Sequence, residues 1–373
     1  MDGFDDRAPR PAPPVIELLP TGPAGYAPAE PALPPPPRTR WRLALLLLGL
    51  TFFTTTTLGP AFWAWTRTDL TTDLVPFLSS GLVRRVWTDP GVLRLGLSFS
   101  VPLLLILLAH ELGHYIACVR YRLAATLPYF LPIPWTLGTL GAFIRIRSPL
   151  RSRKELFDVG IAGPLAGFVV LIPFLVYGVA HSHLAPRPEE LRLGETIALP
   201  GRCLAIELVA RLLLGPLGRD EVLNLHPYAL AAWFGLLATS INLIPLGQLD
   251  GGHILYAVSR HWQRRLAPSV WLGLAAAGFL WPGWWVWCVL TVVFRLFHPP
   301  VQNESAPLGR GRKVLAAVAL AILVLSFTPR GIVILEAVPE DGPAQEDGGT
   351  WVQNLQKSAT SVTGPSLISA TSM

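Results

Sequence analysis

The amino-acid sequence predicts an all-α polytopic membrane protein with about six to seven transmembrane helices or half-helices and a small membrane-associated β-hairpin. Of the 373 residues, 51% are hydrophobic and only 14% are charged, whereas about a quarter of the residues in a soluble domain are charged. The apolar residues form long blocks, and several blocks reach the roughly 20 residues that a helix needs to cross a bilayer. We expect one membrane domain over residues 39–336.

The two ends of the chain have the composition of disordered tails. Residues 1–38 are rich in proline and alanine and end in the run Pro34–Pro37, so they bury too little apolar surface to offset the entropy of ordering. No basic start followed by a short apolar core is present, and we therefore expect no cleavable signal peptide. Residues 337–373 form a second polar tail, which we also expect to be disordered.

The first predicted span covers residues 41–65. Three arginines precede or open it, and Trp63 and Trp65 close it, as expected for side chains of an interfacial aromatic belt. Because basic residues concentrate on the cytoplasmic side of membrane proteins, the N-terminus is expected in the cytoplasm.

Three further spans are predicted at residues 92–119, 157–179 and 227–246, with an amphipathic stretch near 206–214 in the loop before the last of them. Basic residues gather after the second span and predict a cytoplasmic exit there; they are Arg120, Arg122, Arg145, Arg147, Arg151, Arg153 and Lys154. Between these spans, residues 127–147 are apolar but broken by proline and glycine. This pattern predicts a hairpin of two short strands that dips into the membrane.

The C-terminal apolar blocks leave two alternatives open. Residues 268–297 are interrupted by Trp281-Pro282-Gly283, so they form either one span or two short arms, and the basic residues Arg295, Arg310, Arg312 and Lys313 that follow favour two arms. The last block, 314–327, is short for a full crossing, and residues 332–335 are available to extend it.

Three ionisable residues lie inside the second span, within the run Leu107-Leu108-Ala109-His110-Glu111-Leu112-Gly113-His114. Ionisable side chains are costly in hydrocarbon and usually mark a functional site there. Positions four apart lie one above the other on a helix, so His110 and His114 can bind one metal ion. Glu111, rotated by about 100° from His110, faces the same cavity. This is the H-E-x-x-H pattern of zinc peptidases.

A catalytic zinc takes three protein ligands and keeps one position for water, so a third ligand must come from elsewhere. Asp250 is the best candidate. It follows the fourth span in the segment Asn242-Leu243-Ile244-Pro245-Leu246-Gly247-Gln248-Leu249-Asp250-Gly251-Gly252, where proline and glycines break the helix. Irregular backbone at membrane depth usually lines a cavity in the protein, and both motifs end on the same predicted side of the membrane.

The pair of motifs, H-E-x-x-H in one span and N-x-x-P-x-x-x-x-D-G in a later one, resembles the site-2 protease family of intramembrane zinc metalloproteases. The similarity covers roughly residues 93–260 and extends to Gly138–Phe143 and Asp158–Gly167. These segments resemble the branch that includes the chloroplast EGY-type proteases, and neither a PDZ domain nor a CBS domain fits the loops and tails.

The resemblance implies one zinc ion per chain, with His110, His114 and Asp250 as ligands and Glu111 as the general base. It also implies that Asn242 lines the site and contacts substrate. His253, three residues after Asp250, is expected to be a partner of the metal ligands.

The implied function is hydrolysis of peptide bonds in or near the transmembrane helices of membrane protein substrates. We expect an integral, multi-pass protein of the bacterial cytoplasmic membrane, with its active site toward the cytoplasm and with no nucleic-acid partner, because the arginines separate apolar blocks and form no basic stripe. Two alternatives remain. One is a zinc-binding membrane scaffold or transport component without peptidase activity, and the other is a membrane zinc peptidase whose third ligand is a downstream glutamate.

Overall fold

Helices dominate the part of the chain that the computed structural model describes, which comprises residues 40–68, 78–135, 137–186, 196–216, 218, 221–293, 296–298, 301–304 and 307–336. Both predicted tails lie outside these residues. The helices are α1 (Trp41–Trp65), α2 (Ser80–Thr88), α3 (Pro90–Arg120), α4 (Arg153–Ala180), α5 (Leu204–Leu213), α6 (Pro227–Leu243), α7 (Asp250–Val258), α8 (Arg260–Ala277), α9 (Gly283–Val293) and α10 (Arg310–Ser326). The strands are β1 (Tyr129–Pro132), β2 (Thr139–Phe143), β3 (His183–Pro186), β4 (Thr196–Pro200), β5 (Glu221–Asn224) and β6 (Ile332–Glu336).

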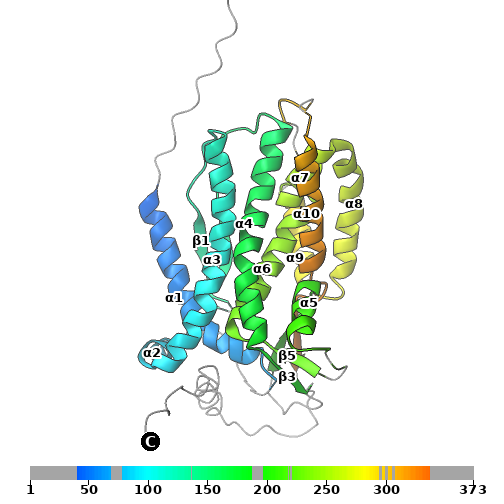
Figure 1. The fold of residues 1–373 in the computed structure, drawn as a ribbon. Helices are drawn as coiled ribbons and strands as arrows, with labels where there is room; N and C mark the ends of the chain where they lie inside the picture. Colours follow the sequence, from blue (N-terminus) through cyan, green and yellow to red (C-terminus); the bar gives the residue numbers. More distant parts are fainter. Residues whose placement is uncertain are drawn as a thin grey trace, which may run out of the picture. The chain divides into compact units, whose positions relative to one another are not determined.

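Three of the described helices, α1, α3 and α4, are long and apolar enough to cross a membrane by length and composition. They run side by side in Figure 1, with α3 between the other two. Helices α6 and α9 are apolar but have only 17 and 11 residues. The predicted membrane character and helical class are therefore confirmed, while the number of six to seven crossings stays a prediction.

Small and hydroxyl-bearing residues join α1 to α3. Thr56 and Ser100 share a buried hydrogen bond of 2.8 Å between their hydroxyl oxygens, and a Cβ atom at Gly96 would clash with the carbonyl oxygen of Thr56. Close approach over small residues with hydroxyl hydrogen bonds is the usual way in which helices associate in lipid. The rings of Phe62, Phe99 and Phe234 then connect both helices to α6.

The predicted hairpin is confirmed. Strands β1 and β2 pair antiparallel, with Tyr129 opposite Phe143 and Phe130 opposite Ala142. Its turn rests on α1, because the hydroxyl of Thr54 donates a 2.7 Å hydrogen bond to the carbonyl oxygen of Gly138. Gly138 has a φ of +82°, a conformation that residues with a side chain rarely adopt. The hairpin is thus attached to the first helix of the bundle.

The described residues between 268 and 293 belong to two arms. Helices α8 and α9 run antiparallel on either side of Trp281-Pro282, since the Nε1 group of Trp285 donates to the Ala275 carbonyl at 3.0 Å and that of Trp271 to the Cys288 carbonyl at 3.2 Å. Helix α8 ends at Ala277, followed by Gly278, and Pro282 directly precedes the first residue of α9. Two short helices therefore replace the single crossing that the hydropathy also allowed.

The suggested extension of the last helix by residues 332–335 was wrong. Helix α10 ends at Ser326, and residues 332–336 form strand β6, which pairs antiparallel with β4. Pro329 and Gly331 interrupt the helix, and the following Ile-Val-Ile run is rich in the β-branched residues that favour strands. Hydropathy alone does not separate a short apolar strand from a turn of helix.

Candidate metal centre

Helix α3 presents His110 and His114 on one face. The two imidazoles are buried, and their Nε2 atoms lie 3.1 Å apart. The spacing follows from the helix itself, because residues four apart are stacked along its surface. The two nitrogens therefore point at one common position between α3 and its neighbours.

Asp250 reaches this position from the first residue of α7. Helix α6 ends at Leu243, and a bend in which Gly247 has a φ of +53° joins it to α7, which continues along α4 in the same direction. Gly251 and Gly252 permit this bend, because a Cβ atom on either would clash with backbone oxygens of the α6 end and of the bend. The two glycines after Asp250 are thus required by the close packing of α7 onto the segment that precedes it.

The three side chains converge. One carboxylate oxygen of Asp250 lies 3.3 Å from Nε2 of His110 and 3.2 Å from Nε2 of His114. A tetrahedral zinc ion with bonds of about 2.0–2.1 Å sets its ligand atoms roughly 3.3 Å apart. The triangle of donor atoms therefore fits one face of a zinc coordination tetrahedron, and two imidazoles with a carboxylate are a ligand set that zinc uses in catalytic sites.

Within the described part of the chain, this is the only group of three metal-ligating residues whose donor atoms lie this close together. No glutamate belongs to it. The geometry brings the predicted ligands together, and their roles as ligands remain predictions.

A backbone carbonyl orients one of the imidazoles. The Nδ1–H of His114 donates to the carbonyl oxygen of Val159 on α4, at 2.7 Å, which leaves Nε2 as the free basic nitrogen of the neutral ring. Asn242, near the end of α6, places its amide nitrogen 3.3 Å from Nε2 of His110. Asn242 therefore lines the metal position, as its motif implied.

Glu111 is buried beside the three clustered side chains, and its carboxylate interacts with the backbone amide of Ile144. Ile144 directly follows strand β2. The predicted general base thus lies between the metal position and the end of the hairpin. Nothing in the sequence could have indicated Ile144 or Val159, because both act through backbone groups that every residue carries.

Glycines on α4 make room for the histidines. A Cβ atom on Gly163 would overlap the imidazole of His114, and one on Gly167 would lie 3.1 Å from Cβ of His110. On α3, Gly113 is packed as tightly against the carbonyl oxygen of Ala162. Helix α4 can therefore approach the metal position only because these residues have no side chain.

Replacing Gly163 with alanine is expected to lower the affinity for zinc by about 10–100-fold, the range found when the supports of metal ligands are removed. The added methyl group occupies the space of the His114 imidazole, so the ring must rotate away from His110 and Asp250. Competition with a chromophoric chelator measures the affinity of the purified protein.

Gly178→Ala is the matched control. Gly178 lies on the same helix, and its added Cβ would clash as severely with the backbone of Ala229, remote from the histidines. Both variants should lose thermal stability, but only Gly163→Ala should lose zinc affinity. Equal zinc affinity in the two variants would contradict the assigned position of His114.

His253 does not touch the metal position. Its ring lies 4.9 Å from the ring of His298, measured between centroids, and its buried Nδ1 atom has no hydrogen-bond partner among the described residues. The expectation that it supports the metal ligands is therefore still a prediction. Cys118 is a buried thiol packed beside Leu123 and Val159.

The far end of α7 is held by an ionic cluster that the sequence did not indicate. Glu304 accepts hydrogen bonds from the Tyr256 hydroxyl at 2.6 Å and from the Arg260 guanidinium at 2.7 Å, and these two donors hold the pKa of its carboxyl below the usual value. Arg153, at the start of α4, donates to the carbonyl oxygens of Ala257 and Val258. The helix that begins with Asp250 is thus fixed to α4 at its opposite end.

Comparison with known proteins gives a consistent result. Residues 98–277 match the model of peptidase family M50. The chain is 32% identical over 60% of its length to a probable chloroplastic zinc metalloprotease, EGY1, of Arabidopsis thaliana. It is 29% identical over 79% of its length to EGY1 of Oryza sativa subsp. japonica, and 31% identical over 68% to EGY2 of Oryza sativa subsp. indica, which are also named probable chloroplastic zinc metalloproteases.

The matched segments span 41%, 52% and 45% of these three relatives, so the chain covers about half the length of the curated relatives it matches. No solved structure matches the chain significantly. The matched segment of the chain, residues 98–277, contains both motifs that supply the three clustered side chains.

Proposed function

We propose that the chain belongs to peptidase family M50, the site-2 protease family, whose model residues 98–277 match, and that it is an intramembrane zinc metalloendopeptidase with His110, His114 and Asp250 as zinc ligands and Glu111 as general base. The observation that carries this proposal is the triangle of donor atoms, separated by 3.1–3.3 Å, on helices of a membrane bundle. The buried carboxylate of Glu111 lies beside this triangle. Peptide hydrolysis needs such a base, whereas a site that only binds a metal does not.

Zinc, when bound, supplies a Lewis acid that polarises a peptide carbonyl and lowers the pKa of water. The carboxylate of Glu111 accepts a proton from the attacking water and delivers it to the departing amine as the C–N bond breaks. Asn242 contacts the substrate beside the metal. The His114–Val159 hydrogen bond keeps the imidazole in the tautomer that the metal requires.

The substrate is a membrane protein with a helical transmembrane segment, which must unwind locally because its carbonyls are otherwise occupied by helix hydrogen bonds. The edge of strand β2 that does not face β1 can accept the unwound segment as an added strand. Two features support this assignment: among the described residues β2 pairs only with β1, so its other edge is unpaired, and the residue after β2 contacts Glu111.

The catalytic domain comprises residues 39–336. In addition to α1, α3 and α4, the shorter helices complete six to seven crossings or half-crossings, with the N-terminus and the active site toward the cytoplasm of a bacterial cell. The basic residues at the junction of α3 and the hairpin and at the start of α4 support this orientation.

Removal of the metal tests the proposed function. The full chain is reconstituted in liposomes with a single-span test protein that carries a proline in its transmembrane helix. A zinc chelator should reduce cleavage to the background level, and added zinc should restore it, because a site with three protein ligands exchanges its metal with solution. Gel analysis and mass spectrometry of the fragments measure cleavage and locate the bond.

A test protein with leucine in place of the proline is the matched substrate control, and it should be cleaved more slowly. Stoichiometric zinc binding without cleavage of either protein, even after zinc is restored, would contradict a peptidase. That result would instead support the zinc-binding scaffold or transport component.

A further inference from the structure

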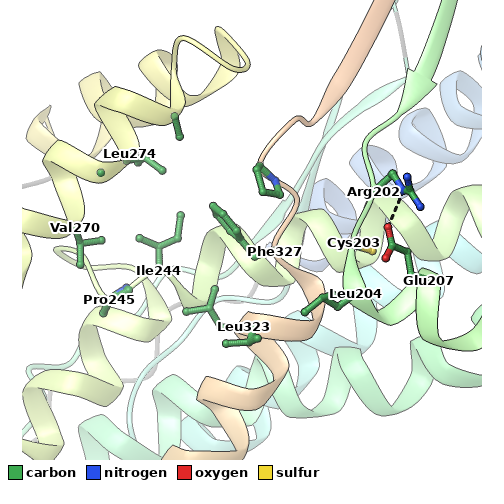
Figure 2. A pocket seen from close by; sticks show the side chains of 14 residues that line it. Arg202, Cys203, Leu204, Glu207, Ile244, Pro245, Val270, Leu274, Leu323 and Phe327 are labelled. Atoms are coloured by element: carbon green, nitrogen blue, oxygen red, sulfur yellow. Dashed lines mark hydrogen bonds and ion pairs between the residues drawn. The ribbon is translucent and has the colours of Figure 1, made fainter. Parts of the chain in front are cut away.

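An apolar groove of about 690 Å³ lies between α5, α8, α10 and the bend that follows α6. Figure 2 shows Leu274 of α8 facing Leu323 and Phe327 of the α10 end, with Ile244 and Pro245 of the bend between them. The groove is separate from the metal position, because none of the metal-binding candidates lines it. The groove is therefore a second candidate binding site of the protein.

Polar groups are confined to one end of the groove. There, Arg202 and Glu207 form an ion pair of 2.7 Å, and the thiol of Cys203 is kept neutral because burial raises its pKa to about 11. Every other side chain lining the groove is apolar or absent. The site therefore suits a ligand with a long apolar part and a polar group at one end.

The groove continues into the outward apolar surface of the bundle. Leu272 and Leu280 at the α8 arm and Leu320 and Val324 of α10 are exposed beside it. Large exposed apolar surface of this kind marks a membrane contact in a protein with spanning helices. The hydrocarbon of the bilayer thus has direct access to the groove.

The groove is too small to enclose a transmembrane helix. A transmembrane helix about 10 Å wide and 30 Å long occupies roughly 2,400 Å³, more than three times the space available. A single extended hydrocarbon chain is narrow enough to enter between α8 and α10. The size therefore favours an acyl chain over a segment of substrate.

The charge at the polar end indicates the kind of lipid. The Arg202 side chain is 72% exposed and engages Glu207 through Nε, which leaves the ends of its guanidinium fork directed to solvent. A planar guanidinium binds phosphate oxygens in pairs. Arg202 lies two residues before the amphipathic helix α5, whose exposed Leu204, Leu208 and Leu212 suit a helix lying at the level of the lipid headgroups.

We propose that this groove binds one acyl chain of an anionic phospholipid, whose phosphate contacts Arg202. The bound chain packs against Ile244 and Pro245, the bend of the polypeptide that leads to Asp250. The proposal does not depend on proteolysis, and a peptidase or a scaffold could equally hold the lipid.

Photolabelling tests the proposal. The full chain is placed in phosphatidylcholine nanodiscs doped with phosphatidylglycerol that carries a diazirine in one acyl chain, and labelled peptides are identified by mass spectrometry after irradiation. Label is expected on residues 270–277 and 323–327. Gly273→Phe should reduce it about tenfold, because a Cβ atom at Gly273 meets no atom within 4 Å and the added ring fills the groove.

Gly49→Phe is the matched control. Gly49 lies on the exposed side of α1 with equally open space around it, so the same ring added there should leave the labelling of residues 270–277 and 323–327 unchanged. Labelling that persists in Gly273→Phe would overturn the proposal, since the lipid would then contact only the outer surface or the groove would serve another occupant.

The headgroup contact has its own test. The same diazirine chain is attached to phosphatidylcholine, and labelling of the groove by the two lipids is compared. Phosphatidylglycerol should label more strongly than phosphatidylcholine in the unmodified protein, and Arg202→Gln should abolish the difference. Equal labelling by both lipids in the unmodified protein would refute the preference of the groove for an anionic phospholipid.

Discussion

Glu111→Gln should reduce cleavage of a membrane substrate by about 10²–10⁴-fold, the usual contribution of general acid–base catalysis. Glutamine keeps the size and most of the hydrogen-bonding capacity of the side chain, but its amide accepts no proton from water. The three ligand atoms are contributed by other residues, so zinc should remain bound. Cleavage rates and zinc content, measured on the same purified sample, separate these two effects.

The matched control for this substitution is Glu221→Gln. Glu221 is exposed at the start of β5, where its carboxylate accepts a hydrogen bond from the backbone of Gly218. The same loss of charge there should leave both cleavage and zinc content unchanged. A Glu111→Gln protein that still cleaves at the original rate would remove Glu111 from the role of base.

Asp250→Ala should lose zinc and, with it, all cleavage. Loss of the residues that support metal ligands alone lowers affinity by about 10–100-fold, and removal of one of three direct ligands should exceed that. Dialysis against a buffered zinc concentration that saturates the unmodified protein, followed by elemental analysis, measures occupancy. It should fall from one zinc per chain to nearly none.

This measurement also distinguishes between the two possible third ligands. If a glutamate elsewhere completed the site, Asp250→Ala would retain its zinc. Asp89→Ala serves as control: Asp89 caps the N-terminus of α3 through the amides of Gly91 and Val92, so its loss costs about 1 kcal/mol of stability but removes no ligand. Its zinc content should match that of the unmodified protein.

Local sequence information was sufficient where a property depends on neighbouring residues. The first span was predicted at residues 41–65, where α1 lies, because an uninterrupted apolar block determines both ends of a helix in lipid. The hairpin was also predicted from local sequence, since proline and glycine at residues 127–147 prevent a helix whatever the rest of the chain does. The spacing of His110 and His114 likewise follows from the helical repeat alone.

Local sequence information did not predict the pairing of segments that lie far apart in the chain. Residues 332–335 were taken as an extension of α10 and are part of strand β6, because their partner, β4, is separated from them by more than a hundred residues. Strand stability depends on such a partner, and helix α2 and the β3–β5 pair were missed as well.

The sequence by itself determined which residues could bind zinc, since ligand chemistry, helical spacing and the cost of charge in hydrocarbon are properties of residue types and of their order. Only the tertiary structure decided that Asp250 meets the two histidines, that Gly163 makes room for His114, and that α5, α8 and α10 leave a groove beside Pro245. The physical reason is that these features are distances between segments far apart in the chain, and packing of the whole bundle sets such distances.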